Sequence, residues 1–232
     1  GKGSELLSGS KHFYDDLGNE IGSAEFMNGE LDKAHCTSFH FNKSETEVTG
    51  EEDEAQTITT GYEKEINPSS YTEEVDPANF YDQFNDSVLS ETITKTVTDA
   101  EGNNLSQTTT YLRGKNKTET VTTYENDDFG RTVKENTIQK KYQDGRWLPS
   151  YETEVSYTYD ENGNVTETET KSRKEGETDW QTQKTKAVYD SKGQVTKEYS
   201  PRGVKENVAA AYTYDLLGRK IKEELPQNKT DG

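Results

Sequence analysis

The sequence has little of the material from which a protein core is usually built. Only 27% of its 232 residues are apolar, compared with roughly 45–50% in an average globular domain. Combined with a formal net charge of -18, this composition is typical of disordered chains. Against disorder stand 14 tyrosines, many threonines and valines, and only 5 prolines, as in strands that half-bury aromatic rings. We therefore expect an ordered protein with a thin core.

Positive charge and long apolar runs are also scarce. The 45 acidic residues outnumber the 27 basic ones, and this excess repels the phosphates of nucleic acids and anionic lipid surfaces. The longest apolar run, about residues 208–212, is far shorter than the roughly 20 residues that a membrane-spanning helix needs. We expect no nucleic-acid partner and no membrane insertion by the chain itself.

The chain has one cysteine, Cys36, which excludes an internal disulfide. The segment HCTSFH around it offers His35, Cys36 and His40 as metal ligands. In a strand, however, His35 and Cys36 point to opposite faces, and no second cluster completes a tetrahedral set. Motifs of serine hydrolases, zinc proteases and phosphate-binding loops are absent. We therefore expect no metal site, no cofactor and no catalytic residue.

What the sequence does contain is a repeated Asp-x-x-Gly segment. Six copies occur, and a seventh has asparagine in place of glycine. The last five glycines are separated by 28, 33, 30 and 25 residues, a loose period that indicates repeated supersecondary units. The seven copies contain Asp15 and Gly18, Asp82 and Asn85, Asp99 and Gly102, Asp127 and Gly130, Asp160 and Gly163, Asp190 and Gly193, and Asp215 and Gly218.

Turn chemistry explains this segment. Aspartate is favoured at the first position of a type I turn because its carboxylate accepts backbone N–H groups further along, and glycine at the fourth position adopts positive φ without a Cβ clash. The segment therefore predicts a type I turn with a glycine bulge, which joins two antiparallel strands. Asparagine in the seventh copy is the next-best residue for positive φ.

The residues before the turns alternate as expected of half-buried strands. Between residues 151 and 159 the odd positions hold Tyr, Thr, Val, Tyr and Tyr, whereas the even positions hold Glu, Glu, Ser and Thr. One face of such a strand carries rings and the other carries charges and hydroxyl groups. No segment convincingly predicts a helix, and we expect residues 77–84 to form a loop leading into a strand. The expected fold is all-β, an elongated, twisted antiparallel meander of hairpins in which cross-strand pairs replace a deep core.

The segments YTYDENGN and YTYDLLGR, which begin at Tyr157 and Tyr212, resemble the RHS or YD-repeat family. The resemblance is good over residues 124–224 and weakens back to about residue 76. It implies a hairpin unit in a bacterial protein that is secreted or held at the cell surface, for instance by a lipid anchor upstream of residue 1. Long members form a shell around a toxin domain, which a chain of this length cannot do. Positions that depart from the repeated tyrosines are Thr98, Asn126 and Ala187.

Composition and repeats together divide the chain into four expected regions. Residues 1–11 read as a flexible tether, and residues 12–75 as a divergent β region with one repeat-like turn. Residues 76–226 form the repeat region, and residues 227–232 a tail.

Exposed aromatic rings are the candidate ligand contacts, since rings beside carboxylates and hydroxyls stack on sugar faces. By odd-even parity Trp147 shares a face with the tyrosines that follow it, whereas both tryptophans could instead cap the hydrophobic face at hairpin ends. We expect a non-enzymatic structural or adhesive module whose partner is a glycan or a surface protein. The alternatives are a polysaccharide-acting enzyme with a carboxylate pair and a spacer that displays something else. The candidate aromatics are Trp147, Trp180, Tyr151, Tyr157, Tyr159, Tyr212 and Tyr214.

Overall fold

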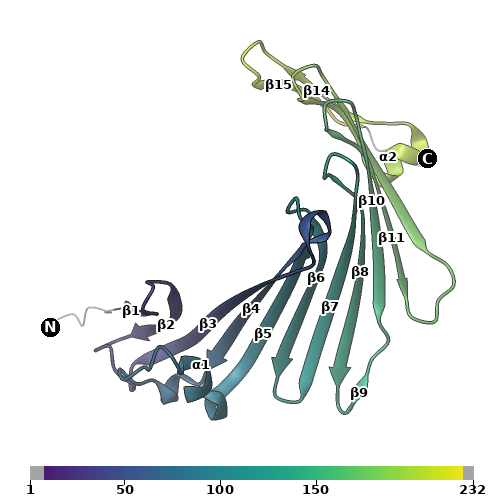
Figure 1. The fold of residues 1–232 in the computed structure, drawn as a ribbon. Coiled ribbons are helices and arrows are strands. Elements are labelled where there is room, and N and C mark those ends of the chain that lie inside the picture. Colours follow the sequence, from purple (N-terminus) through teal and green to yellow (C-terminus); the bar gives the residue numbers. More distant parts are fainter. Residues whose placement is uncertain (1–7, 227–232) are drawn as a thin grey trace. The chain divides into compact units, whose positions relative to one another are not determined.

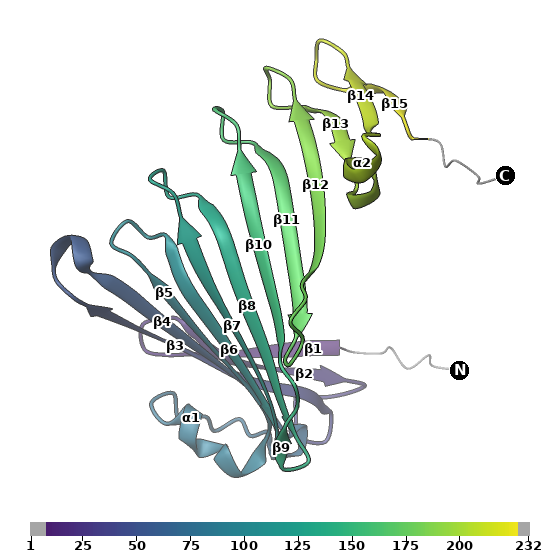
Figure 2. The same ribbon diagram turned by 90° about the vertical axis from the view of Figure 1, so that its right-hand side faces the viewer.

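The computed structural model describes residues 8–226. For Tyr81 it describes the backbone but not the side chain. Antiparallel β-hairpins follow one another along the chain (Figures 1 and 2). Each strand from β1 to β8, and each from β10 to β15, is hydrogen-bonded to the next strand in the sequence. Strand β8 pairs with β10, and the short strand β9 also pairs with β8. The predicted all-β meander of hairpins is therefore confirmed.

The chain divides into two compact units. Unit 1 comprises Gly1–Val121 and Gln139–Leu148, and unit 2 comprises Thr122–Ile138 and Pro149–Gly232. The strands of unit 1 are β1 (Ser8–Tyr14), β2 (Glu20–Met27), β3 (Cys36–Thr49), β4 (Gln56–Ile66), β5 (Val88–Thr98), β6 (Asn104–Arg113) and β9 (Arg146–Trp147). Strands β7 (Asn116–Asn126) and β8 (Thr132–Gln143) contribute to both units. Those of unit 2 are β10 (Tyr151–Tyr159), β11 (Val165–Lys174), β12 (Gln181–Tyr189), β13 (Val195–Tyr199), β14 (Ala210–Tyr214) and β15 (Lys220–Glu224).

Short helices interrupt the meander in both units. Unit 1 contains the α-helix α1 (Phe80–Gln83) and the 3-10 turns η1 (Glu52–Glu54), η2 (Pro68–Ser70) and η3 (Asn85–Ser87). Unit 2 contains α2 (Pro201–Glu206). Both η2 and α1 contact β3, and α2 contacts β12 and β13.

These units differ from the regions expected from the sequence. Strand β1 begins at Ser8, so the described part of the expected tether is a strand. Residues 12–75 belong to the same strand order as the repeats, and the expected boundary at residue 75 lies inside unit 1. The remainder of the tether, residues 1–7, and the tail, residues 227–232, lie outside the described residues.

Six of the seven Asp-x-x-Gly segments form the turn that their chemistry favours. In the turn at Asp160, the Gly163 N–H donates to the Asp160 carbonyl at 3.1 Å, and the Asp160 N–H donates to the Asn164 carbonyl at 3.0 Å. Gly163 has a φ of 85°, and the register of β10 with β11 shifts between Thr158 and Tyr159, which is the glycine bulge. The same backbone bonds close the turns at Asp15, Asp99, Asp127, Asp190 and Asp215.

Side chains lock these turns from within. Asp160 Oδ1 accepts the backbone N–H groups of Asn162 and Asn164, both at 2.9 Å, and Asn164 Nδ2 donates to Asp160 Oδ2 at 2.9 Å. In the last turn Arg219 takes this role, with Nε donating to Asp215 Oδ2 at 2.7 Å. Donation from Asn164 and from Arg219 holds the pKa of the Asp160 and Asp215 carboxyl groups below the usual value. This closure explains why asparagine or arginine follows the glycine in five of the six turns. In the sixth, Gln194 follows Gly193, and its side chain donates to the Gly218 carbonyl instead.

The seventh segment does not form this turn, so its prediction was wrong. Asp82 lies in α1, and Asn85 begins η3 without positive φ. Asn85 Oδ1 instead accepts a hydrogen bond from the buried Lys64 ammonium at 2.9 Å. Phe80 and Phe84, four residues apart on one helical side, are both buried. Their packing overrides the local turn chemistry, which also explains why the expected loop over residues 77–84 contains the short helix α1.

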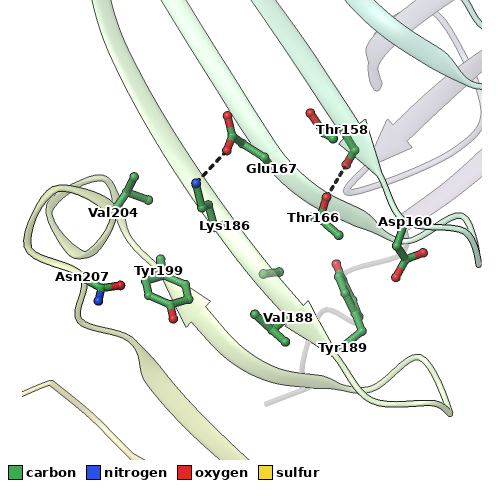
Figure 3. Close-up of a pocket in the computed structure, with 11 residues that line it drawn as sticks. Thr158, Asp160, Thr166, Glu167, Lys186, Val188, Tyr189, Tyr199, Val204 and Asn207 are labelled. Carbon is green, nitrogen blue, oxygen red and sulfur yellow. Dashed lines mark hydrogen bonds and ion pairs between the residues drawn. The ribbon is translucent and has the colours of Figure 1, made fainter.

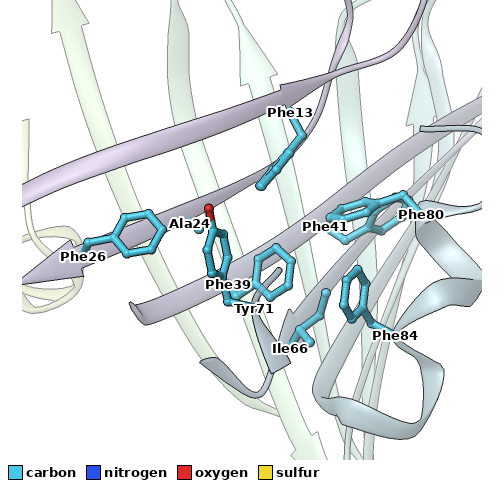
Figure 4. Packing of buried hydrophobic residues seen from close by; sticks show 9 residues of the cluster. All are labelled: Phe13, Ala24, Phe26, Phe39, Phe41, Ile66, Tyr71, Phe80 and Phe84. Atoms are coloured by element: carbon cyan, nitrogen blue, oxygen red, sulfur yellow. The ribbon is translucent and has the colours of Figure 1, made fainter. Parts of the chain in front are cut away.

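Unit 1 contains an aromatic core that the sequence analysis did not anticipate (Figure 4). Phe39 is fully buried, and its ring centroid lies 6.0 Å from that of Phe13, 5.6 Å from Tyr71 and 5.1 Å from Phe84. Such tilted and edge-on contacts are favourable for aromatic pairs. Unit 1 therefore adds a small aromatic core to the predicted meander of hairpins. Six of the seven phenylalanines of the chain are buried there, namely Phe13, Phe26, Phe39, Phe41, Phe80 and Phe84.

The described part of unit 2 has no fully buried apolar side chain. In addition to backbone pairing between neighbouring strands, its hairpins are joined by tyrosine staples, which are hydrogen bonds from the tyrosine before a turn aspartate to a backbone carbonyl of the preceding hairpin. Each acceptor lies two residues after the glycine of the preceding turn, so the staple repeats with the motif. The three staples are Tyr159 to Thr132 (2.6 Å), Tyr189 to Val165 (2.9 Å) and Tyr214 to Val195 (2.8 Å).

Replacing Gly163 with valine should lower the free energy of unfolding by about 1–3 kcal/mol, because a β-branched residue at positive φ is strained. The nearest atom to an added Cβ is Arg131 Nη1 at 3.9 Å, so the loss would report the backbone conformation. Gly218→Val should lose a similar amount, with an added contact to Gln194. Urea unfolding of the full chain measures both losses.

Gly61→Val is the matched control for these two variants. Gly61 lies inside β4, has no positive φ, and an added Cβ would meet only the Thr94 carbonyl oxygen at 3.9 Å. Because valine favours strands, this variant should retain or gain stability. An equal loss at Gly61 and Gly163 would contradict the assigned role of the turn glycines.

Candidate binding surfaces

The strand register of unit 2 gathers the repeat tyrosines on one side of the sheet. Side chains alternate along a strand, and directly paired residues share a face. We call this side the tyrosine face, and it includes all five tyrosines expected to contact a ligand. The structure adds Tyr189, which the sequence analysis did not single out. Its tyrosines on β10 to β14 are Tyr151, Tyr157, Tyr159, Tyr189, Tyr212 and Tyr214.

The hydroxyl groups of this face are mostly engaged, while the rings stay partly exposed. Beyond the three staples, Tyr157 donates to Glu135 at 3.3 Å and Tyr212 donates to Glu198 at 3.0 Å. Partial burial, reinforced by Glu135, raises the pKa of Tyr157. The bond to Glu198 raises the pKa of Tyr212. Tyr151 is the most open of the set, with 56% of its surface exposed.

The two tryptophans do not belong to the tyrosine face. Trp180 stacks on the Arg173 guanidinium at 4.3 Å, and Arg173 pairs with Glu152 on the opposite side of the sheet. Trp147 lies on β9 in unit 1, 49% exposed, with its ring 5.4 Å from that of Tyr142. Residues 148–150 separate β9 from β10, so odd-even parity does not carry across them. The parity argument that grouped Trp147 with the tyrosines therefore no longer applies, and within unit 2 Trp180 lies outside the tyrosine face.

The opposite side of unit 2, which we call the ladder face, carries a series of ion pairs across β8, β10, β11 and β12. Single exposed pairs contribute only about 0–1 kcal/mol each, but here shared residues link neighbouring pairs. The opposite-charge cross-strand pairs expected from the sequence are therefore present. They are Lys134–Glu154 (2.9 Å), Lys171–Glu154 (3.4 Å), Arg173–Glu152 (2.7 Å), Lys184–Glu167 (3.1 Å), Lys184–Glu169 (3.0 Å) and Lys186–Glu167 (3.0 Å).

These ion pairs shift the pKa values of their members. Lys134 lowers the pKa of Glu154, and Lys186 with Lys184 lowers that of Glu167. The two neighbouring glutamates raise the pKa of Lys184. Within residues 8–226, every carboxyl group with a clearly shifted pKa has a lowered one. A general acid at neutral pH needs a raised pKa, so none of these groups suits that role.

A cleft of about 560 Å³ opens on the ladder face beside α2 (Figure 3). Its walls combine apolar side chains from the sheet and from α2 with polar groups at the rim. The lining residues that matter below are Glu167, Lys186, Val188, Tyr199, Val204 and Asn207.

The helix α2 corrects the expectation that the chain has no helix. The Ser200 hydroxyl accepts the Gly203 N–H at 3.1 Å, and Pro201 occupies the first turn. Asn207 ends the helix in the left-handed conformation. Serine before proline, followed by asparagine at the end, is a helix signature. These local signals were available in the sequence.

Unit 1 has an open groove of about 790 Å³ whose acidic residues include Asp15, Glu20 and Asp82. Each of these three carboxylates already has a neighbour. Asp15 holds its turn, Glu20 lies 3.0 Å from His12 Nδ1, and Asp82 accepts from Asn85 at 3.3 Å. Glu63 is the fourth acidic residue that lines this groove.

The HCTSFH segment makes local contacts. His35 Nδ1 lies 2.7 Å from Asp32 Oδ1, and the Cys36 thiol donates to the Ser38 carbonyl at 3.4 Å. Burial raises the pKa of Cys36. Over residues 8–226, no three His, Cys, Asp or Glu side chains are grouped so as to hold a metal ion. None of the helices in this range is long and apolar enough to cross a membrane.

The ion pairs of the ladder face predict a plateau of stability. A glutamate whose pKa is lowered in the folded protein stabilises the fold at pH values above its unfolded pKa of 4.5. This contribution disappears as pH falls through the lowered pKa of the folded state. The raised pKa of Lys184 stabilises below 10.5, and that contribution disappears as pH rises through the raised value. We expect urea unfolding to show stability falling on both sides of about pH 5–10.

Glu154→Gln isolates this effect from the loss of overall charge repulsion at low pH, because it changes the net charge by only one. The parent should be more stable than the variant near neutral pH. This difference should vanish as pH falls through the lowered pKa of Glu154, where its carboxylate becomes protonated. A difference that stays constant down to pH 2 would contradict the ion-pair account.

Comparisons with known proteins identify no family. No model of a protein family matches the chain, and no curated protein matches it either. The resemblance of its turn segments to YD repeats therefore stays a prediction, and function must be argued from the surfaces described above.

Proposed function

We propose that the chain is a non-enzymatic structural and adhesive module that works outside a bacterial cell and contacts a glycan or another surface protein through its tyrosine face. The observation that supports the proposal is that hydrogen bonds hold the tyrosine side chains of this face in place. Five of its six tyrosine hydroxyls are hydrogen-bonded to neighbouring hairpins, while the rings remain partly exposed.

Fixed aromatic rings favour binding for an entropic reason. A side chain that is already held in one rotamer loses little freedom when a partner covers it, so more of the contact energy appears as affinity. Tyrosine also offers a large amphipathic contact area with only two side-chain torsions. Glu135 and Glu198 lie beside these rings and supply acceptors for sugar hydroxyl groups. These features favour a glycan over a protein as the partner.

The enzyme alternative finds less support. The carboxyl groups with resolved shifts are all held more acidic than usual. The ladder glutamates are paired with lysine or arginine, so they lack the unpaired, desolvated setting that raises a catalytic pKa. The extracellular setting rests on the resemblance to surface repeats, and the single cysteine and acidic composition are compatible with it.

A glycan array probed with the full chain and with Tyr151→Ala tests the proposal. Tyr151 is exposed and forms no staple, so its removal should leave the fold intact. We expect the variant to bind the recognised glycan about tenfold more weakly, equivalent to about 1.4 kcal/mol. Trp180→Ala, on the opposite face, is the matched control and should bind like the parent.

Two outcomes would contradict this assignment. Equal binding by Tyr151→Ala and the parent would show that the tyrosine face is not the contact surface. Loss of binding in Trp180→Ala alone would move the contact to the ladder face. If no glycan binds but Tyr151→Ala abolishes capture of a bacterial surface protein, the partner class is protein.

A further inference from the structure

The cleft beside α2 lies where the repeat pattern is interrupted. Strands β11 and β12 have 10 and 9 residues, whereas β13 has only 5 and is followed by α2. Strands β13 and β14 then share only two paired positions, Lys197 with Ala211 and Glu198 with Ala210. Continuing the meander does not require this detour. Departures from an otherwise consistent local pattern often mark functional sites.

The cleft has an apolar wall made from three elements. Val188 and Tyr199 come from β12 and the end of β13, and Val204 comes from α2 (Figure 3). Val188 retains 44% of its surface exposed, so a ligand rather than the protein would complete its burial. Side chains of this kind pack against the C–H face of a ligand ring.

Two polar side-chain groups that line the cleft are available for hydrogen bonds to a ligand. Within residues 8–226, neither the Tyr199 hydroxyl nor the Asn207 side-chain amide has a hydrogen-bond partner. This sets Tyr199 apart from the stapled tyrosines of the other face. An amide provides both donors and an acceptor, and a phenol provides one of each. Together they match the mixed donor and acceptor character of sugar hydroxyl groups.

The charged residues at the rim are already neutralised. Lys186 pairs with Glu167 at 3.0 Å, and Glu167 also pairs with Lys184 at 3.1 Å. Asp160 accepts three hydrogen bonds within its own turn. An anionic ligand would have to displace Glu167 from Lys186, and a cationic ligand would have to displace lysine from Glu167. The cleft is therefore suited to an uncharged ligand.

From these observations we propose that the cleft binds an uncharged saccharide. The sugar ring packs on Val188, Tyr199 and Val204, and its hydroxyl groups bond to the Tyr199 hydroxyl and the Asn207 amide. The cleft volume of about 560 Å³ falls within the roughly 300–1,000 Å³ of small-ligand sites. This site goes beyond the proposed function, since the residues that hold the sugar are not those of the tyrosine face, of which only Tyr189 also lines the cleft.

The test uses the full chain, an array of neutral, sialylated and sulfated glycans, and calorimetry on any neutral saccharide that binds. Tyr199→Phe keeps the ring and removes the hydroxyl. Asn207→Gly removes the amide and suits the positive φ of 53°, so α2 should persist. We expect the double variant to lose at least tenfold in affinity for the neutral saccharide at an unchanged melting temperature.

Tyr111→Phe is the matched control, because it removes a partly exposed phenol on β6 that belongs neither to the tyrosine face nor to the lining of the cleft. It should bind the neutral saccharide as the parent does. Loss of binding in the cleft double variant, while the control binds as the parent does, supports the cleft site, whatever Tyr151→Ala shows. Loss confined to Tyr151→Ala overturns the cleft site but leaves the proposed function standing. Binding of charged glycans alone, or of no neutral saccharide, also overturns it.

Discussion

Unit 2 depends on the tyrosine staple, the hydrogen bond from a repeat tyrosine to a backbone carbonyl of the preceding hairpin. Its acceptor lies two residues after the turn glycine, at Thr132, Val165 and Val195. The aspartate turn fixes the start of each returning strand, so turn and staple together determine where the next hairpin attaches. Each bond contributes on the order of 0.5–1.5 kcal/mol net. Three of them are a substantial part of the roughly 5–15 kcal/mol by which a domain is usually stable.

Unit 1 keeps the same hairpin order by different means. Its aromatic core is formed by β1 to β4 and the segment around α1, and the repeat tyrosine is dispensable there. Thr98 takes its place before one turn aspartate, and its hydroxyl reaches the Thr57 carbonyl at the long distance of 3.5 Å. Tyr14, in the first described hairpin, is 52% exposed. The meander is thus stabilised by buried aromatic rings in unit 1 and by hydrogen-bonded tyrosines in unit 2. The tyrosine rings of unit 2 stay partly exposed.

The sequence predicted what depends on local chemistry. Asp-x-x-Gly identified six turns, and alternation along residues 151–159 placed the tyrosines of β10 on one face. It failed where distant residues decide, as when Phe80 and Phe84 pack into the core and turn Asp82 into a helical residue. The face on which Trp147 lies could not be predicted, because odd-even parity does not carry across the loop of residues 148–150. The cleft could not be predicted at all, because it forms where α2 packs against β12. The helix begins more than ten residues after this strand ends, so no local sequence pattern reports the contact.

The most direct test of the staple account is native-state hydrogen exchange on the full chain in which Tyr159, Tyr189 and Tyr214 are all changed to phenylalanine. The rings and turns remain, and only the three hydroxyl groups are lost. The account predicts that amides of β10 to β14 exchange with a free energy lowered by about 2–4 kcal/mol, while amides of β2 to β4, beside the aromatic core, are unchanged. Unchanged protection in β10 to β14 would contradict it.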